Sequence, residues 1–208
     1  DNVTSCELMA RQGVDLVLQH IPGSADPLAE RHEWYVLLEW SSTRPRRAGT
    51  NETGLLEKME AYLGEAMEQG LVLDAALAQN EAQARAFWGL RENHSESQKR
   101  EGPSIKHDIS VSVSKIPAFM TEGLVAMKKA LPECRPVPFG HVGAGNLHFN
   151  CQAPAGWEKA RFMAHADAIS GAAYEGAFGN PLADLYLLEV AAGAGLGATG
   201  LFTPVGAR

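Results

Sequence analysis

The sequence predicts an α+β fold in which an antiparallel sheet has helices packed on one face, as in ferredoxin-like folds. Few segments have the character of strands, and long amphipathic segments separate them. From Glu33 onward the expected order is strand, helix, strand, helix, strand, helix, strand, strand, helix. This order is compatible with an antiparallel sheet that has helices along one side.

Hydrophobic periodicity assigns the elements of the first half of the chain. Apolar residues at helical spacing predict a helix over residues 4–20, which ends before Pro22. A strand is predicted over residues 33–40, where apolar side chains recur with a period of two. Amphipathic helices are expected over residues 51–70 and 81–100, with a short strand over residues 71–77 between them.

The same criterion assigns the second half. Apolar and polar residues alternate over residues 105–113, which predicts a strand. A helix is expected next, with Pro117 in its first turn, where proline costs little. The remaining elements are this helix at residues 116–131, strands at residues 136–139 and 146–151 around a glycine loop, and a helix at residues 154–170.

Residues 1–170 are predicted to form one domain, and residues 171–208 an atypical tail rich in glycine and alanine. Two interpretations of the tail stay open, a buried terminal segment or a poorly specified extension. Residues 195–200 fit G-x-G-x-x-G, but a dinucleotide-binding motif needs a following helix and a second strand. We therefore attribute the match to composition.

Composition restricts the classes of function. The chain has 208 residues and a formal net charge of -7, which disfavours a nucleic-acid-binding role. No apolar run is long enough to cross a bilayer, and no signal peptide is visible. The three cysteines, Cys6, Cys134 and Cys151, form neither a disulfide framework nor a zinc ribbon, so we expect reduced thiols in a cytoplasmic protein.

The strongest local signal is the glycine-rich segment at residues 140–150. Period two places Asn146, His148 and Asn150 on one face of the strand that leaves the loop. His141 precedes the loop and can fold back beside His148. Two neutral imidazoles suit zinc, manganese or iron, although such a site usually needs a third ligand. The alternative is a pair of ordinary structural histidines.

Two further groups of polar residues are candidates. Arg91 and Ser95 are four residues apart and would share one helix face, where the arginine could bind a carboxylate. The alternative is a solvated basic face. Lys106 and Asp108 point the same way from the alternating strand, as an ion pair or as a substrate anchor.

In this order, residues 91–99, 104–111 and 138–150 resemble the C-terminal domain of the FAD-linked oxidases of the vanillyl-alcohol-oxidase type. The family includes the D-2-hydroxyglutarate and D-lactate dehydrogenases and the glycolate oxidase subunit. The similarity extends from near the N-terminus to about Ser170, and the glycine–histidine segment is quite specific to the family.

The resemblance implies the substrate-binding part of an FAD-dependent dehydrogenase that oxidises a D-2-hydroxy acid to a 2-keto acid by hydride transfer to flavin. It implies a divalent metal such as zinc, a small 2-hydroxy-acid substrate, and FAD held mainly by a flavin-binding domain that this chain lacks. The implied roles are substrate binding for Arg91, Ser95, Lys106 and Asn150, metal ligation for His141 and His148, catalysis for His148, and cofactor contact for Asn146.

Two departures from the family pattern affect the metal. Ala144 stands where the family has an aspartate, and the segment with the family's third metal ligand, a glutamate, has no clear counterpart. We expect Glu175 not to replace that ligand, so the metal could be lost here. The chain opens without methionine, so we expect a fragment. Because the sequence contains no convincing pyrophosphate-binding segment, we also expect that this chain alone neither holds FAD nor turns over.

Two alternatives belong to other classes of function. The first is a non-catalytic ferredoxin-like domain that binds a small anion or a partner subunit. The second is a stand-alone metal-dependent enzyme that uses only the two histidines. A homodimer is compatible with either interpretation, and no membrane span is expected.

Overall fold

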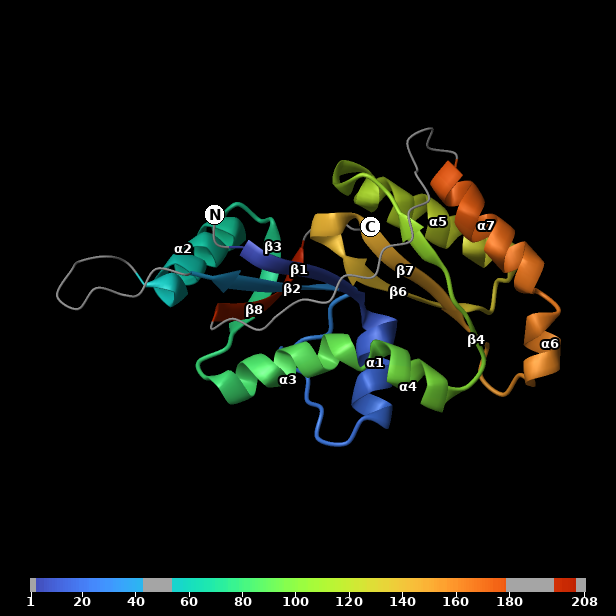
Figure 1. The fold of residues 1–208 in the computed structure, drawn as a ribbon, viewed down its shortest axis with the longest axis horizontal. Coiled ribbons are helices and arrows are strands. Elements are labelled where there is room, and N and C mark those ends of the chain that lie inside the picture. Colours follow the sequence, from blue (N-terminus) through green and yellow to red (C-terminus); the bar gives the residue numbers. More distant parts are fainter. Residues whose placement is uncertain (1–2, 43–53, 179–196, 205–208) are drawn as a thin grey trace.

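The computed structural model describes residues 3–42, 54–178 and 197–204, with side chains described through residue 174 (Figure 1). The helices are α1 (Arg11–His20), α2 (Leu55–Glu68), α3 (Glu81–Glu92), α4 (His94–Glu101), α5 (Ile116–Ala130), α6 (Lys159–Met163) and α7 (Ala166–Phe178). The strands are β1 (Val3–Ala10), β2 (Trp34–Ser41), β3 (Val72–Leu77), β4 (Ser104–Ile105), β5 (Asp108–Ser110), β6 (Arg135–His141), β7 (Asn146–Gln152) and β8 (Gly197–Pro204). None of the described helices is both long enough and apolar enough to span a membrane.

The strands form one sheet in the order β3-β8-β2-β1-β6-β7-β4, and β5 pairs with β7 beside β4. Every described pairing is antiparallel. The predicted α+β class with an antiparallel sheet is therefore confirmed. The segment predicted as a tail contributes β8, which lies between β2 and β3.

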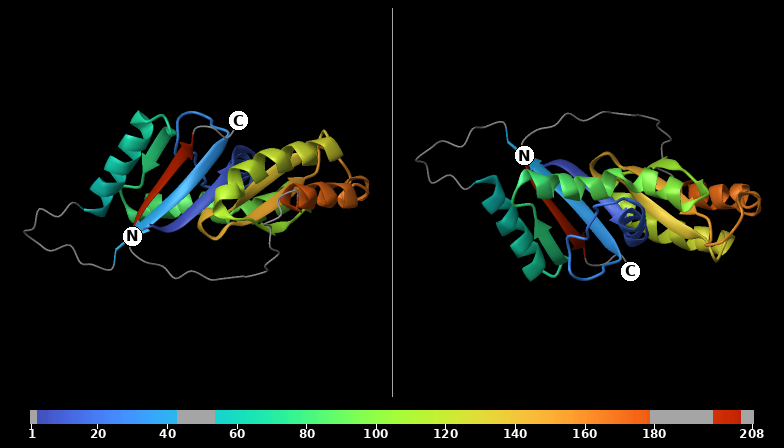
Figure 2. Two further views of the ribbon diagram at one scale, coloured as in Figure 1. Left: turned by 90° about the horizontal axis from the view of Figure 1, so that it is seen from above. Right: turned by 90° about the horizontal axis from the view of Figure 1, so that it is seen from below.

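Helices cover both faces of the sheet, whereas the sequence predicted helices on one face. Figure 2 shows α2, α5 and α7 on one side and α1, α3 and α4 on the other. The reason lies in β2, whose successive residues are buried alternately on the two faces. Val36 belongs to the core beneath α5 and α7, while Tyr35 and Leu37 pack with residues of α1 and α3. A central strand buried on both faces reads as a continuous apolar run, as in Trp34–Leu38.

The prediction of a helix over residues 4–20 was wrong for its first part, which is a strand. Residues 4–10 belong to β1, and the helix begins only at Arg11. β1 pairs with β2 on one side and β6 on the other, so its conformation is set by partners far away in the sequence. Spacing alone cannot distinguish a short apolar run of a central strand from the start of a helix.

Three other predicted elements are interrupted. The long helix over residues 81–100 is two helices, because Asn93 leaves the helical conformation and bonds the carbonyl of Gly89 through both its backbone N and its Nδ2. The strand over residues 105–113 is divided into β4 and β5 at the buried His107. The last predicted helix is α6 and α7, and α7 continues to Phe178. The other predicted helices and strands are confirmed with small shifts at their ends.

The glycine loop between β6 and β7 is held against the segment that follows β5. Gly145 has a φ of 68°, donates its backbone N–H to the Val142 carbonyl and accepts from the backbone N–H of Val111. A Cβ atom at Gly145 would lie well under 3.0 Å from the Val111 carbonyl oxygen, which is backbone and cannot move aside. This position therefore requires glycine.

We expect Gly145→Ala to lower the free energy of unfolding by roughly 2–4 kcal/mol, from left-handed strain and overpacking together. Gly143→Ala is the matched control in the same loop, because its Cβ would meet nothing within 4 Å, and its change should stay within about 0.5 kcal/mol. Denaturant unfolding of both variants measures the difference. Equal losses in the two variants would contradict the account.

A buried histidine lies where α1 meets α4. His94 is fully buried; its Nδ1 lies 2.7 Å from the Leu90 carbonyl, and its Nε2 has no partner among the described residues. A Cβ atom at Gly13 would collide with this ring, so the glycine permits the close approach of α1. Burial, opposed only in part by the hydrogen bond to Leu90, lowers the pKa of His94 to about 3.

Acidification should therefore destabilise the fold through His94. Below the unfolded-state pKa of 6.5 the unfolded chain takes up a proton that native His94 does not, so stability falls with pH down to about 3. The slope from this one group approaches roughly 1.4 kcal/mol per pH unit. We expect His94→Leu to reduce the slope of the unfolding free energy between about pH 6.5 and 5. An undiminished slope in the variant would show that another group is responsible.

Candidate active site

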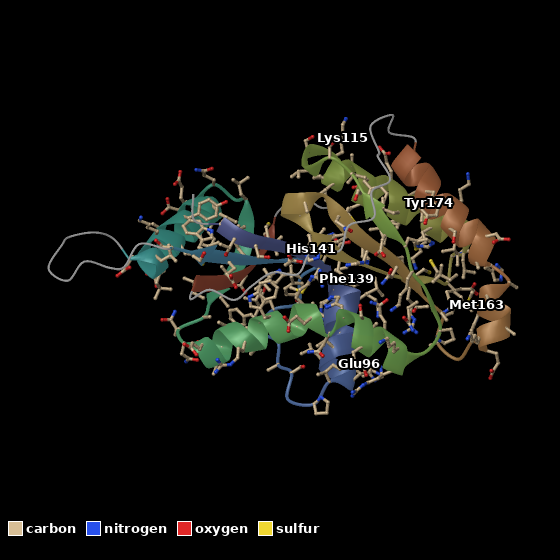
Figure 3. The ribbon with its side chains drawn as sticks, in the orientation of Figure 1. Glu96, Lys115, Phe139, His141, Met163 and Tyr174 are labelled. Carbon is tan, nitrogen blue, oxygen red and sulfur yellow. The ribbon has the colours of Figure 1, made fainter. Side chains whose placement is uncertain are left out.

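Two neighbouring rungs of the sheet bring several polar residues together on the face toward α3 and α4. Glu7, His141 and Asn146 are opposite one another on β1, β6 and β7. Phe139, His148 and Asp108 form the next rung, on β6, β7 and β5. Because paired residues in an antiparallel sheet point to the same face, these side chains converge. Phe139 and His141 lie side by side near the middle of the molecule (Figure 3).

Glu7 is a buried carboxylate at the centre of this group, only 3% exposed. Its Oε1 lies 2.8 Å from Nδ1 of His141 and accepts from the Ser5 hydroxyl at 2.9 Å. Its Oε2 accepts from Nε of Arg91 at 2.8 Å. Burial alone would raise the pKa of Glu7, but the His141 hydrogen bond and the Arg91 charge outweigh it and lower the pKa. Glu7 is therefore ionised at neutral pH.

His148 has a similar arrangement on the next rung. Its Nδ1 is hydrogen-bonded to Oδ1 of Asp108, an exposed carboxylate on β5. Burial lowers the pKa of His148 and outweighs the opposing effect of Asp108. The rings of His141 and His148 lie 6.2 Å apart in an edge-on arrangement. In both residues a carboxylate engages Nδ1, so Nε2 is the ring nitrogen left for other partners, as is usual for histidines that bind metals.

The Phe139 ring contacts three neighbouring side chains, Arg91, His148 and His94. The Arg91 guanidinium lies 4.8 Å above its ring, and the rings of His148 and His94 lie 4.7 Å and 4.9 Å from it. Arg91 is itself buried and forms its ion pair with Glu7. A guanidinium between a carboxylate and an aromatic face is held in one orientation.

The predicted site residues separate into two groups. Arg91, His141 and His148 come together, and Asn146 lies beside His141 with its Oδ1 buried and without a hydrogen-bond partner in the described part of the chain. Ser95 and Lys106 are exposed. Ser95, which was predicted to share a helix face with Arg91, is exposed on α4, whereas Arg91 is buried on α3, and the helix is interrupted at Asn93 between them.

Asn150 lies on β7, two residues after His148, and its side chain forms hydrogen bonds with other residues of the protein. It is buried, its Nδ2 donates to Oε1 of Gln98 at 3.1 Å, and its Oδ1 accepts from the backbone N–H of His107 at 3.2 Å. These bonds connect α4 and the β4–β5 junction to β7. In this structure the hydrogen bonds of Asn150 hold β7 in place two residues from His148.

The two imidazoles of His141 and His148 are the candidate metal ligands of this site. No group of three histidine, cysteine, aspartate or glutamate side chains in the described residues is arranged to hold a metal ion. The side chain of Glu175 lies outside the described residues. The fit is therefore partial, with two imidazoles whose Nδ1 atoms are already engaged by carboxylates.

Sequence reasoning missed Glu7 and Phe139 and left Asp108 undecided. Glu7 was hidden because residues 4–20 were assigned to a helix, although the apolar run after it is typical of a buried strand. Asp108 was considered as a partner of Lys106, whereas its described ion pair is with His148. Phe139 was read as a strand residue with no role in a site.

Comparisons with known proteins identify the family of the chain. Residues 1–178 match the family described as "FAD linked oxidases, C-terminal domain". The chain is 36% identical over 164 residues to a D-2-hydroxyglutarate dehydrogenase of Xanthomonas citri pv. viticola. The aligned region covers 79% of this chain and 32% of that relative. It is 33% identical over 152 residues to the mitochondrial D-2-hydroxyglutarate dehydrogenase of Arabidopsis thaliana, and this aligned region covers 73% of the chain and 25% of that relative.

A relative from Stutzerimonas stutzeri, also named D-2-hydroxyglutarate dehydrogenase, is 34% identical over 164 residues. The chain spans about a quarter to a third of the length of these curated relatives. The match covers β1, β6 and β7 and with them both histidines and Glu7. This chain therefore belongs to the family of FAD-linked oxidase C-terminal domains.

Proposed function

We propose that the chain is the substrate-binding part of an FAD-dependent dehydrogenase that oxidises a D-2-hydroxy acid to a 2-keto acid by hydride transfer to flavin. The observation that carries the proposal is the grouping of Arg91, His141 and His148 around Phe139. A fixed guanidinium beside two oriented imidazoles suits an anionic substrate that must lose a hydroxyl proton. The names of the relatives support the same reaction class.

In this proposal Arg91 binds the substrate carboxylate and His148 handles the hydroxyl proton. Asp108 engages Nδ1 of His148, so Nε2 is the nitrogen that accepts the proton. Lowering of the pKa of His148 by burial keeps the imidazole neutral and able to act as a base at neutral pH. Asn146, whose Oδ1 is buried without a hydrogen-bond partner among the described residues, is the residue that would contact the cofactor.

A divalent metal such as zinc would be held by Nε2 of His141 and of His148, with the remaining ligands supplied from elsewhere. When bound, the metal acts as a Lewis acid that lowers the pKa of the substrate hydroxyl. The two roles of His148 compete for the same nitrogen, because Nε2 cannot ligate the metal and accept a proton at once. If a metal were bound, His148 would serve as its ligand and would not act as the base.

The limits of the domain are part of the proposal. The family match and α7 both extend to residue 178, beyond the expected boundary at residue 170. We place the flavin-binding domain in a part of the protein outside this chain. The free thiols of Cys6, Cys134 and Cys151 support a reducing compartment such as the cytoplasm. A homodimer is compatible with the proposal.

The metal half of the proposal is tested by elemental mass spectrometry of the full-length flavoprotein that contains this domain, because the described residues of this chain offer only two candidate ligands. We expect near-stoichiometric zinc, manganese or iron in the wild type and its loss in His148→Ala, because each ligand contributes directly to metal affinity. No metal in either protein would contradict metal binding by this chain. That result would favour the alternative, a non-catalytic domain that binds a small anion or a partner subunit.

The catalytic half is tested in the full-length flavoprotein that contains this domain, by dye reduction that depends on D-2-hydroxyglutarate. We expect His148→Ala to lower kcat by roughly 10²–10⁴-fold, because the substitution removes either the general base or a ligand of the metal that would activate the substrate hydroxyl. His165→Ala is the matched control, since His165 lies between α6 and α7 against Trp157, outside the site. Equal rates for wild type and His148→Ala would overturn the role of His148.

A further inference from the structure

Glu7 accepts hydrogen bonds from two groups with different proposed roles, the candidate metal ligand His141 and the candidate substrate-binding residue Arg91. Its Oε1 binds Nδ1 of His141 and its Oε2 binds Nε of Arg91. An ionised carboxylate has only acceptors, and a guanidinium has only donors. Nδ1 of His141 must therefore carry the ring proton, which leaves the lone pair on Nε2. One buried side chain thus sets the tautomer of an imidazole and the orientation of a guanidinium.

We propose that Glu7 is the positioning residue of this site, which fixes His141 as the Nδ1–H tautomer and aims Arg91 at the same time. The assignment rests on the proposed function for what the two groups then do, but the tautomer itself follows from the hydrogen bonds alone. Glu7 binds Arg91 through Nε, so Glu7 itself does not occupy the two terminal nitrogens with which a guanidinium binds a carboxylate. The lone pair on Nε2 of His141 stays available in the same way.

Burial makes this arrangement more specific than a surface contact. Glu7 and Arg91 are both buried, and neither can exchange its partner for water at low cost. Arg91 therefore competes with His141 for the acceptors of Glu7: Oε2 accepts from Arg91, and Oε1 accepts from His141 and from the Ser5 hydroxyl. His148 lacks this competition, because Asp108 is 64% exposed and its described ion pair is with His148 alone.

The competition predicts the effect of replacing Glu7 with an amide. In Glu7→Gln only one oxygen remains, and Arg91 must take it because a guanidinium cannot accept a hydrogen bond. The amide NH₂ then faces His141, whose Nδ1 must become the acceptor. His141 should switch to the Nε2–H tautomer and lose its free lone pair. In the matched control, Asp108→Asn, no arginine competes, so the amide oxygen turns to His148 and its tautomer is unchanged.

Two-dimensional ¹⁵N NMR of the histidine rings in the metal-free chain, at about pH 8 where imidazoles are mostly neutral, reads the tautomers directly. We expect both His141 and His148 as Nδ1–H in the wild-type chain. In Glu7→Gln the protonated and unprotonated nitrogen signals of His141 should exchange places, while His148 keeps its pattern. A nuclear Overhauser contact between the His141 and His148 rings should persist and show that the ring has not swung out.

A double variant tests the cause. In Glu7→Gln with Arg91→Met, the amide oxygen is no longer claimed by the guanidinium, so the Nδ1–H tautomer of His141 should return. A protein in which Glu7 merely supports the fold would show no such reversal. An Nε2–H tautomer of His141 in the wild-type chain overturns the proposal even if the variants fail to fold. An unchanged His141 tautomer in Glu7→Gln overturns it as well.

Zinc titration of the same samples separates this inference from the proposed function. We expect Glu7→Gln to bind zinc roughly 10–100-fold more weakly than wild type, as on loss of a partner that orients a ligating histidine. If no variant binds zinc but the tautomers behave as described, the metal half of the proposed function fails and the role of Glu7 stands. If zinc binds equally to wild type and Glu7→Gln, the role of Glu7 is overturned.

Discussion

The pairing of β1 with β6 is the contact on which the rest of the sheet depends. It is only three residues long, Glu7 with His141, Leu8 with Gly140 and Met9 with Phe139. On one side of it lie β3, β8, β2 and β1, and on the other lie β6, β7 and β4. The candidate site sits on this junction, so the residues that join the two parts of the sheet also bring Glu7 to His141.

A buried ion pair is a demanding element at such a junction. Removing one partner of a buried pair commonly costs about 3–5 kcal/mol, whereas the intact pair adds little net stability over an apolar replacement. The Glu7–Arg91 pair is therefore better understood as specifying one arrangement of β1, α3 and β6 than as stabilising the fold. The stacking of Arg91 and His148 on Phe139 restricts the same arrangement further.

The parts of the structure that were predicted correctly are those in which local pattern decides the conformation. β2, β7 and α5 follow from alternation, from the glycine loop and from Pro117 in the first helical turn. β1 could not be predicted in this way, because only its partners in the sheet make it extended. The split at Asn93 arises from one side chain that bonds a nearby carbonyl, and spacing does not reveal it.

The residues of the candidate site also divide into those that the sequence revealed and those that only the folded structure revealed. His141, His148 and Arg91 were found through a motif and a family resemblance, and the structure brings them together. Ser95 and Lys106 came from the same resemblance but are exposed here, and Asn150 is bonded to Gln98 and His107. Glu7 was beyond reach because its importance depends on a register between strands more than a hundred residues apart.

Strand β8 has a consequence for the order in which the chain can fold. It lies between β2 and β3, and β3 has no other described strand partner. More than 150 residues separate β2 from the strand that completes this edge. Until β8 arrives, β2 is an open edge and β3 has no ladder, a state exposed to pairing with other chains. During synthesis, β2 and β3 therefore cannot complete their pairing until the segment that forms β8 has been made.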